Sequence, residues 1–231
     1  MATALDFSRG GGNLHIGGFQ ALDVLSYYGL RVPRGQLART PDDAAAIAAA
    51  IGFPVVMKVV SPNIMHKSDV GGIRVGVTDT EGAVEAFEEI QVAVRGNMPE
   101  ALFLGVAVQE QIADAREVII GAARDPQFGP LLMFGLGGIY VEVLKDISFR
   151  IAPISRNDAQ QMMHEVKSYP LLTGSRGEQS YDTNAIVDAL LRCSQLVTDF
   201  PGILEMDLNP LLIKTRGQGA YVADARMVIT P

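Results

Sequence analysis

The stretch VVMKVVSPNIMHKSDVGGIRVGV, residues 55–77, holds two short apolar runs on either side of a segment rich in turn-forming residues. The runs cover residues 55–60 and 72–77, and their valines and isoleucine favour strands. The connecting segment contains a proline and ends at two adjacent glycines, which favour turns. This pattern predicts a hairpin of antiparallel strands, and therefore a sheet that is antiparallel at this point.

Outward from this hairpin, helical and strand-like segments follow one another without a regular alternation. Apolar spacing and flanking helix signals predict helices over residues 19–28, 41–51, 80–94, 156–167 and 184–198. Short apolar runs predict further strands over residues 102–110, 117–122, 131–134, 149–153, 203–207, 211–214 and 221–224. Strands joined by short turns, with helices inserted unevenly, favour an α+β fold with mainly antiparallel sheets.

The ends of the predicted segments carry signals of their own. Thr40 followed by Pro41 marks a helix start, and Thr80 is expected to cap the next helix. Residues 1–15 include several glycines and show no apolar period. We therefore expect a flexible N-terminal lead over residues 1–15.

Composition and charge limit the classes of partner. The net charge of −7 and the pI near 5.0, without a stripe of lysine and arginine, disfavour binding to nucleic acid. Charged residues interrupt every apolar run before the ~20 residues that a membrane span needs. Cys193 is the single cysteine, which excludes an intrachain disulfide, and the N-terminus lacks the basic and apolar regions of a signal peptide. We expect a cytoplasmic protein that binds neither nucleic acid nor membrane.

The opening hairpin also contains residues suited to phosphate chemistry. Lys58 lies in an otherwise apolar strand, where an ammonium group needs an anion such as phosphate, unless the strand is an edge strand and the side chain faces water. The loop offers His66, whose neutral imidazole can accept a phosphoryl group, and the hydroxyl of Ser68. Gly71 and Gly72 allow backbone N–H groups to approach phosphate oxygens closely. The alternative is a polar hairpin loop with a surface histidine.

Two glutamates flank a predicted bend between strands. Glu110 ends one strand and Glu117 begins the next. Carboxylates accept hydrogen bonds well, so this pair is suited to an adenine amino group and a ribose hydroxyl. The alternative is that both are solvated strand ends.

A second group of oxygen-bearing side chains lies near the C-terminus. Glu205, Asp207 and Asn209 alternate along a predicted strand, so their side chains share one face. If the chain turns and returns beside this strand, Asp224 can lie opposite them. One or two carboxylates with an amide oxygen suit a magnesium ion that also binds substrate phosphates. The alternative is the exposed polar face of a hairpin.

Two common nucleotide-binding motifs are absent from the sequence. Gly135, Gly137 and Gly138 lack the G-x-G-x-x-G spacing of a dinucleotide loop, and the chain contains no G-x-x-x-x-G-K-[ST] P-loop. A Rossmann site and a P-loop site are therefore excluded.

The order of the remaining pieces resembles the ATP-grasp domain of NDP-forming acyl-CoA synthetases, also called ADP-forming acetyl-CoA synthetases. The likeness covers about residues 19–230 and extends more distantly to the β subunit of succinyl-CoA synthetase. It implies two α+β lobes that clasp ATP or ADP together with Mg²⁺. The small lobe would cover about residues 30–108, and the large lobe about residues 16–29 and 109–231.

The resemblance implies roles for the nucleotide-binding residues. Lys58 resembles the lysine that reaches phosphate and adenine, Glu110 lies at the adenine hinge, and Glu117 matches the ribose-side carboxylate. The loop would contact the phosphates, through Ser68, Gly71 and Gly72.

The resemblance also implies a metal site and a phosphoryl relay. Asn209 and Asp224 match the magnesium ligands, and Asp207 would assist them. His66 is similar to the histidine that receives a phosphoryl group from a histidine on the CoA-binding portion. The succinyl-CoA branch lacks this second histidine, so His66 indicates the acetyl-CoA branch.

The family's overall reaction joins a small carboxylic acid and CoA at the expense of ATP, and releases ADP and phosphate. A CoA-binding domain and a ligase domain do not fit within this length, so the reaction requires an α subunit or domain that carries the other phosphohistidine. Two alternatives stay open: an ATP-grasp carboxylate–amine ligase, and a non-catalytic nucleotide-sensing module of a fused acyltransferase.

Overall fold

The computed structural model describes residues 8–10, 12–64, 66–174 and 180–230. The chain forms two compact units, of which unit 1 combines Met1–Val32 with Ala113–Pro231 and unit 2 is Pro33–Ile112. The units divide after residues 32 and 112, near the approximate boundaries of 29 and 108 that the sequence suggested. Arg31 stays with unit 1 because its carbonyl accepts the Val222 N–H at 2.8 Å.

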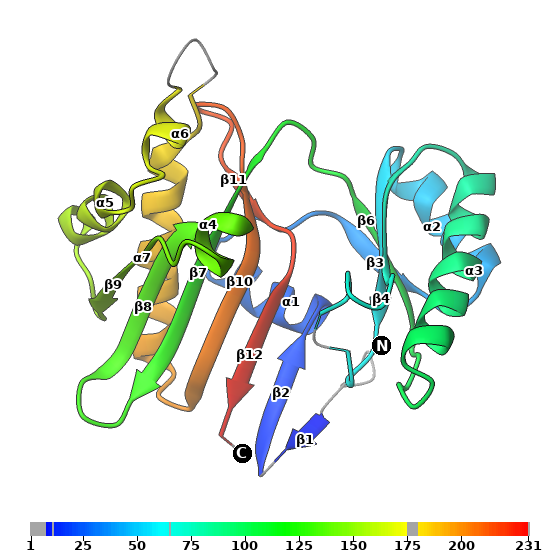
Figure 1. The fold of residues 1–231 in the computed structure, drawn as a ribbon, viewed down its shortest axis with the longest axis horizontal. Helices are drawn as coiled ribbons and strands as arrows, with labels where there is room; N and C mark the ends of the chain where they lie inside the picture. The colour runs from blue at the N-terminus through cyan, green and yellow to red at the C-terminus, as the bar shows by residue number, and fades with distance from the viewer. Residues whose placement is uncertain (1–7, 11, 65, 175–179, 231) are drawn as a thin grey trace. The chain divides into compact units, whose positions relative to one another are not determined.

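Unit 2 is built on a four-stranded antiparallel sheet in the order β3-β6-β4-β5 (Figure 1). Its strands are β3 (Gly35–Ala38), β4 (Val55–Val60), β5 (Ile73–Val77) and β6 (Gly105–Glu110). The predicted hairpin is confirmed, because β4 pairs with β5 in antiparallel register. β4 also pairs with β6, which places β4 inside the sheet.

Two helices, α2 (Pro41–Ile51) and α3 (Thr80–Asn97), cover one face of this sheet. Thr40 and Asp43 form a reciprocal capping box at the start of α2, as the Thr40-Pro41 signal indicates. The cap of α3 is Asp79 and not Thr80, because the Asp79 carboxylate accepts the Gly82 N–H at 2.8 Å. The core between helices and sheet consists of apolar side chains, among them Ala44, Ala48, Val55, Met57, Val59, Phe87 and Ile90.

Unit 1 is built on a larger antiparallel sheet in the order β1-β2-β12-β10-β7-β8-β9, with β11 paired to β10 (Figure 1). Its strands are β1 (Ser8–Gly10), β2 (Asn13–Gly17), β7 (Arg116–Asp125), β8 (Gly129–Leu136), β9 (Ile147–Ile151), β10 (Ile203–Ile213), β11 (Ala220–Val222) and β12 (Ala225–Ile229). The strand pairs are antiparallel in both units, so the predicted α+β class with antiparallel sheets is confirmed.

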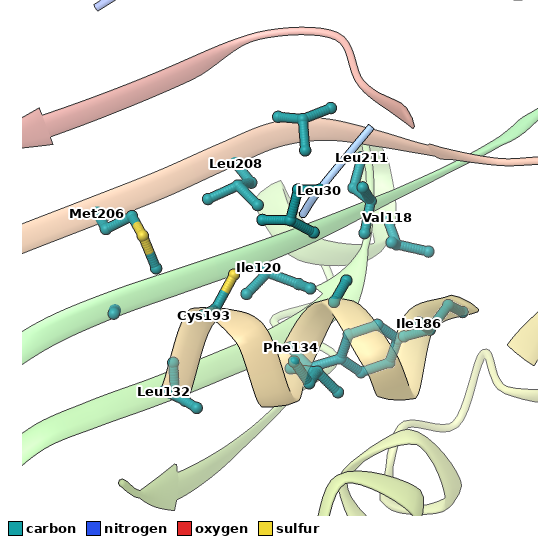
Figure 2. Packing of buried hydrophobic residues seen from close by; sticks show 14 of the residues in the cluster. Leu30, Val118, Ile120, Leu132, Phe134, Ile186, Cys193, Met206, Leu208 and Leu211 are labelled. Atoms are coloured by element: carbon teal, nitrogen blue, oxygen red, sulfur yellow. The ribbon is translucent and has the colours of Figure 1, made fainter. Parts of the chain in front are cut away.

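The helices of unit 1 are α1 (Phe19–Tyr27), α4 (Ile139–Glu142), α5 (Arg156–Glu165), α6 (Pro170–Thr173) and α7 (Thr183–Asp199). Figure 2 shows how α7 packs on the sheet: Cys193 and Ile186 lie against Ile120 and Phe134 of β7 and β8. Cys193 is completely buried, and burial raises the pKa of its thiol to about 12. It is a core residue, as its helical context predicts. Among the described residues, no helix is both long enough and apolar enough to cross a membrane.

Several sequence predictions change in unit 1. Residues 8–10 and 13–15, expected in a flexible lead, lie in β1 and β2, and β2 pairs with β12; residues 1–7 and 11 lie outside the described residues. The predicted strands 203–207 and 211–214 are one strand, β10, with a register shift between Leu208 and Leu211. The predicted strand 221–224 ends at residue 222, and β12 follows it. Long-range pairing supplies backbone hydrogen bonds that local composition does not reveal.

Candidate active site

Lys58 lies on the face of the unit 2 sheet that its two helices leave uncovered. Val55, Met57 and Val59 of β4 are fully buried on the helix side, so the alternating Lys58 side chain points to the other side. Lys58 is aligned with Ala107 of β6 and with Ile73 of β5. The edge-strand explanation is therefore wrong: the lysine lies in an inner strand, partly buried.

The His66 loop connects β4 to β5 and is closed by its own backbone. The Gly72 N–H donates to the Lys67 carbonyl at 2.7 Å, and the Gly71 N–H donates to the Ser68 carbonyl at 3.0 Å. These two amide N–H groups are thus hydrogen-bonded within the loop. The contact of Gly71 and Gly72 with phosphate stays a prediction, and it would require these hydrogen bonds to open. The side chains of His66 and Ser68 are exposed.

Gly72 is required by packing, and its substitution gives a first prediction. A Cβ at this position would lie 2.4 Å from Val59 Cγ1 and 2.9 Å from the Lys67 carbonyl oxygen. We expect Gly72→Ala to lower the free energy of unfolding by about 1–3 kcal/mol, measured by thermal or denaturant unfolding. The matched control is Gly96→Ala in α3, where a Cβ meets nothing within 4 Å. It should be neutral or raise stability by up to about 1 kcal/mol, and equal effects of the two substitutions would contradict the prediction.

Glu110 is held by an arginine that sequence reasoning missed. The Arg34 Nε donates to Glu110 Oε2 at 3.0 Å, and the Glu110 N–H donates to the Arg34 carbonyl at 2.8 Å. Its side chain is 35% exposed, so it is accessible to a ligand that shares it with Arg34. The two residues lie 76 positions apart, and no local spacing connects them. Glu110 thus ends β6 just before the boundary of unit 2.

Glu117 lies in β7 on the face of the unit 1 sheet opposite the core. Its neighbour Val118 is fully buried on the core side, whereas Glu117 is exposed and is aligned with Leu212 of β10. The Gly137 N–H donates to the Glu117 carbonyl at 3.0 Å. A Cβ on Gly137 would lie 3.1 Å from the Glu117 Cβ. Within the glycine run that does not fit a dinucleotide loop, Gly137 therefore has a different task, which is to pack closely against Glu117.

Asp207 and Asn209 share the face that contains Glu117. Met206 and Leu208 are buried in the core, with 2% and 0% exposure, so the alternating Asp207 and Asn209 point away from it. Asp207 is aligned with Gly121 of β7, and Leu212 with Glu117, which assigns all of these side chains to one side.

Asp224 lies directly beside Asn209. The Asn209 N–H donates to the Asp224 carbonyl at 3.1 Å, and the Ala223 N–H donates to the Pro210 carbonyl at 3.0 Å. The Asp224 Oδ1 accepts the Ala225 N–H at 3.0 Å, which orients the carboxylate. The sequence predicted that Asp224 would lie opposite this strand if the chain turned back beside it, and the structure shows that the chain does turn back. Ala225, the next residue and the first of β12, belongs to the core and is aligned with Leu208.

The donor set of Asp207, Asn209 and Asp224 fits magnesium bound together with a substrate. Among the described residues, no three His, Cys, Asp or Glu side chains gather closely enough to hold a metal ion by themselves. Two carboxylates and an amide are consistent with that finding, because Mg²⁺ commonly takes few protein ligands and completes its shell with phosphate oxygens and water.

Arg226 is a further candidate residue, to which sequence reasoning gave no role. It is aligned with Asp207, on the same side of the sheet, while its neighbours Ala225 and Met227 belong to the core. Arg226 is two residues from Asp224, and this spacing, which places two strand residues on the same face, could have indicated it in the sequence. Unit 1 thus carries Glu117, Asp207, Asn209, Asp224 and Arg226, whereas unit 2 carries the other candidates, Lys58, His66, Ser68, Gly71, Gly72 and Glu110.

A model of the ATP-grasp domain family matches residues 9–229. The chain is 52% identical over 212 residues to acetate–CoA ligase (ADP-forming) I of Archaeoglobus fulgidus. The aligned region covers 92% of this chain and 30% of that protein. It is 48% identical over 212 residues to the β subunit of acetate–CoA ligase (ADP-forming) II of Pyrococcus furiosus, with 91% and 90% covered. The chain therefore spans about a third of the first relative and nearly all of the second.

Solved structures agree with these relatives. The dinucleotide-forming acetyl-coenzyme A synthetase 1 of Ca. Korarchaeum cryptofilum, in complex with coenzyme A, Ca-AMPCP and HgCl⁺, matches with a TM-score of 0.89 and 45% identity over 93% of each chain. Another structure of that protein holds coenzyme A and Mg-AMPPCP, with its phosphohistidine segment pointing towards the nucleotide binding site. It matches with a TM-score of 0.78 and 43% identity over 91% of this chain and 90% of that chain.

These matches confirm the resemblance first drawn from the order of motifs. Because the family model matches residues 9–229 and the chain covers 90% of a related β subunit, the chain belongs to the ATP-grasp domain family, in the branch of the ADP-forming acetate–CoA ligases.

Proposed function

We propose that this chain is the nucleotide-binding, phosphoryl-transferring part of an ADP-forming acyl-CoA synthetase. The observation that carries the proposal is the pairing of Asn209 with Asp224 on the open face of the unit 1 sheet, in a chain of this family. Because the chain spans only 30% of a single-chain relative, the complete activity depends on a further subunit or domain. That partner would bind CoA and the carboxylic acid and would carry its own phosphohistidine.

Unit 1 would hold the nucleotide and its metal ion. Asp207, Asn209 and Asp224 would bind Mg²⁺, which would neutralise charge on the phosphates of ATP. Glu117 would accept a hydrogen bond from the ribose. These assignments rest on the shared face of the four side chains and on the donor chemistry that magnesium prefers.

Unit 2 would supply the transfer chemistry. Lys58 would neutralise charge on the transferring group, where a preorganised cation contributes most. The neutral imidazole of His66 would attack the γ-phosphorus: a P–N bond forms, the bond to the oxygen of the ADP leaving group breaks, and the ring loses its other proton to solvent. Transfer from His66 to the partner's histidine exchanges one P–N bond for another, and one proton moves between the two rings in compensation. In the synthetic direction the complete enzyme would convert acid, CoA and ATP to acyl-CoA, ADP and phosphate.

Titration calorimetry of the chain with Mg-ATP and with Mg-ADP tests the proposal. We expect saturable binding that weakens when EDTA removes the magnesium, and acid-labile phosphate on His66 after incubation with Mg-ATP. No heat with any purine nucleotide would refute the proposal. Binding without phosphate on His66 would instead favour the acylphosphate chemistry of a carboxylate–amine ligase or a nucleotide-sensing module.

A further inference from the structure

The chain passes between its two units twice, after Val32 and after Ile112. The proposed site is divided in the same way, because unit 1 carries the metal ligands and unit 2 carries Lys58 and His66. Phosphoryl transfer requires the reacting groups to be placed to within about 1 Å. The residues that fix the two crossings therefore matter for the reaction, although none of them needs to touch the substrate.

On the unit 2 side, the two crossings are tied to each other by Arg34 and Glu110. The Glu110 N–H donates to the Arg34 carbonyl at 2.8 Å, and the Arg34 Nε donates to Glu110 Oε2 at 3.0 Å. Arg34 is the second residue after the first crossing, and Glu110 lies two residues before the second. The next residue, Gln111, is held as well: its N–H donates to the Pro54 carbonyl at 3.2 Å, and its Oε1 accepts the Gly76 N–H at 2.8 Å.

Strand register places the Glu110 side chain on the face opposite Lys58. Glu110 is aligned with Val55, which is fully buried in the core between the sheet and the helices of unit 2. Lys58 is aligned with Ala107 and points to the other face. Because aligned residues of antiparallel strands share one face, the Glu110 carboxylate is placed to hold Arg34.

On the unit 1 side, both crossings are tied to the hairpin of β10 and β11. The Arg31 carbonyl accepts the Val222 N–H at 2.8 Å, and the Arg31 guanidinium donates to the Gln218 carbonyl at 3.3 Å. Lys214, the residue after β10, donates through Nζ to the Ala113 carbonyl. One hairpin thus receives the end of the first crossing and the start of the chain's return.

The tip of this hairpin is anchored by Asp182, which is 8% exposed. Its Oδ2 accepts the N–H groups of Gly217 and Gly219, each at 3.0 Å. Its Oδ1 accepts the Ala185 N–H at 3.2 Å, at the start of α7. Hydrogen bonds to an ionised carboxylate are among the stronger ones, so the hairpin is firmly joined to the core helix α7.

We propose that Val32, Pro33 and Ile112 form a narrow joint between the units, and that Arg34 and Lys214 are positioning residues that fix its two sides. These three joint residues are what remains between the tied residues on either side. Proline restricts its own φ and the conformation of the residue before it, so the first crossing has little freedom. The joint restricts how the transfer residues of unit 2 move relative to the metal ligands of unit 1, a consequence that rests on the proposed function.

Paired substitutions test the Arg34 side in the enzyme reconstituted with its CoA-binding partner. We expect Arg34→Gln and Glu110→Gln each to lower kcat for acyl-CoA formation by about 3–5-fold, near the upper range for an exposed ion pair. The double substitution should be no worse than either single one, because both remove the same contact. Exchange of the charges, Arg34→Glu with Glu110→Arg, should restore kcat to within about 1.5-fold of wild type. The Kd of Mg-ATP should stay within about twofold throughout.

The matched control is Glu89→Gln. Glu89 pairs with Arg74 through the same two atoms, Oε2 and Nε, at 2.7 Å, and this pair lies in unit 2 at neither crossing. The control should keep the kcat of wild type. A loss confined to the Arg34 and Glu110 variants then assigns the effect to the crossings and not to the loss of a surface charge.

The Lys214 side is tested by a distance measurement that needs neither the partner nor activity. Spin labels are attached to Ala49→Cys in α2 and Gln160→Cys in α5, two exposed positions in different units. The chain's own Cys193 is completely buried and does not compete for the label. We expect Lys214→Met to broaden the distribution of label–label distances. Lys214→Arg, which keeps a donor for the Ala113 carbonyl, should retain the distribution of wild type.

Three outcomes separate this joint from its rivals and from the proposed function. If substitutions on both sides leave kcat and the label distances at the level of the Glu89→Gln control, the joint is refuted while the proposed function stands. If Glu110→Gln weakens Mg-ATP binding by about tenfold or more and Arg34→Gln does not, Glu110 is a nucleotide ligand and its positioning role is refuted. If wild-type protein neither binds Mg-ATP nor phosphorylates His66, the proposed function fails, and the label distances alone decide on the joint.

Discussion

Substitution of His66 by alanine should reduce ATP-coupled acyl-CoA formation by on the order of 10³-fold or more, while Mg-ATP affinity stays within about twofold. The imidazole would carry the phosphoryl group between the nucleotide and the partner, and no other nucleophile of the loop can replace its nitrogen. The measurement combines steady-state turnover of the reconstituted enzyme with calorimetric titration of Mg-ATP. Because His66 is exposed, the free energy of unfolding should change by less than about 0.5 kcal/mol.

The matched control for His66 is His164→Ala. His164 is also exposed, but it lies in α5 of unit 1, where its ring is 4.2 Å from the ring of Tyr169. Turnover of this variant should equal that of wild type. Normal turnover of His66→Ala would remove the histidine from the mechanism and leave a direct transfer from nucleotide to partner.

Asp224→Asn should lower turnover by roughly 10²–10³-fold and raise the magnesium concentration needed for half-maximal rate. The substitution removes one negative charge from the proposed metal site and retains the shape of the side chain and the oxygen that accepts the Ala225 N–H. Turnover measured across a range of magnesium concentrations checks both effects. The fold should persist, because the Asn209 N–H binds the backbone carbonyl of residue 224 and not its side chain.

Asp23→Asn provides the same change of charge at an exposed position of α1. Its magnesium dependence should match that of wild type. Identical magnesium curves for Asp224→Asn and Asp23→Asn would show that Asp224 does not bind the metal, and the site would then have to be sought elsewhere.

Residue types and their alternation predicted much of unit 1 correctly. Met206 and Leu208 alternate with Asp207 and Asn209, and this alternation imposed a two-sided strand, because successive residues of a strand point to opposite faces. In unit 1 the position of α7 followed from apolar spacing, and in unit 2 that of α2 followed from end signals such as Thr40. Residue roles at the site stay predictions, and the experiments above test them.

Local signals failed where the outcome depended on partners far away in the chain. β1 and β2 have little apolar pattern, and pairing of β2 with β12 gives them their backbone hydrogen bonds. Arg34 binds Glu110 although the two are 76 residues apart. Gly137 packs on Glu117, which its own neighbours do not indicate.

The sequence by itself determined the antiparallel α+β class, the family, and the polar face of β10, because each depends on residue type, order and spacing along short segments. Only the tertiary structure decided that Lys58 lies in an inner strand, that the amides of Gly71 and Gly72 close their own loop, and that Asp224 lies beside Asn209. The loop closes through local turns within residues 67–72, and strand order and register decide the other two points. Both arise from pairing between distant segments, and that pairing depends on how the whole core packs and not on any one stretch.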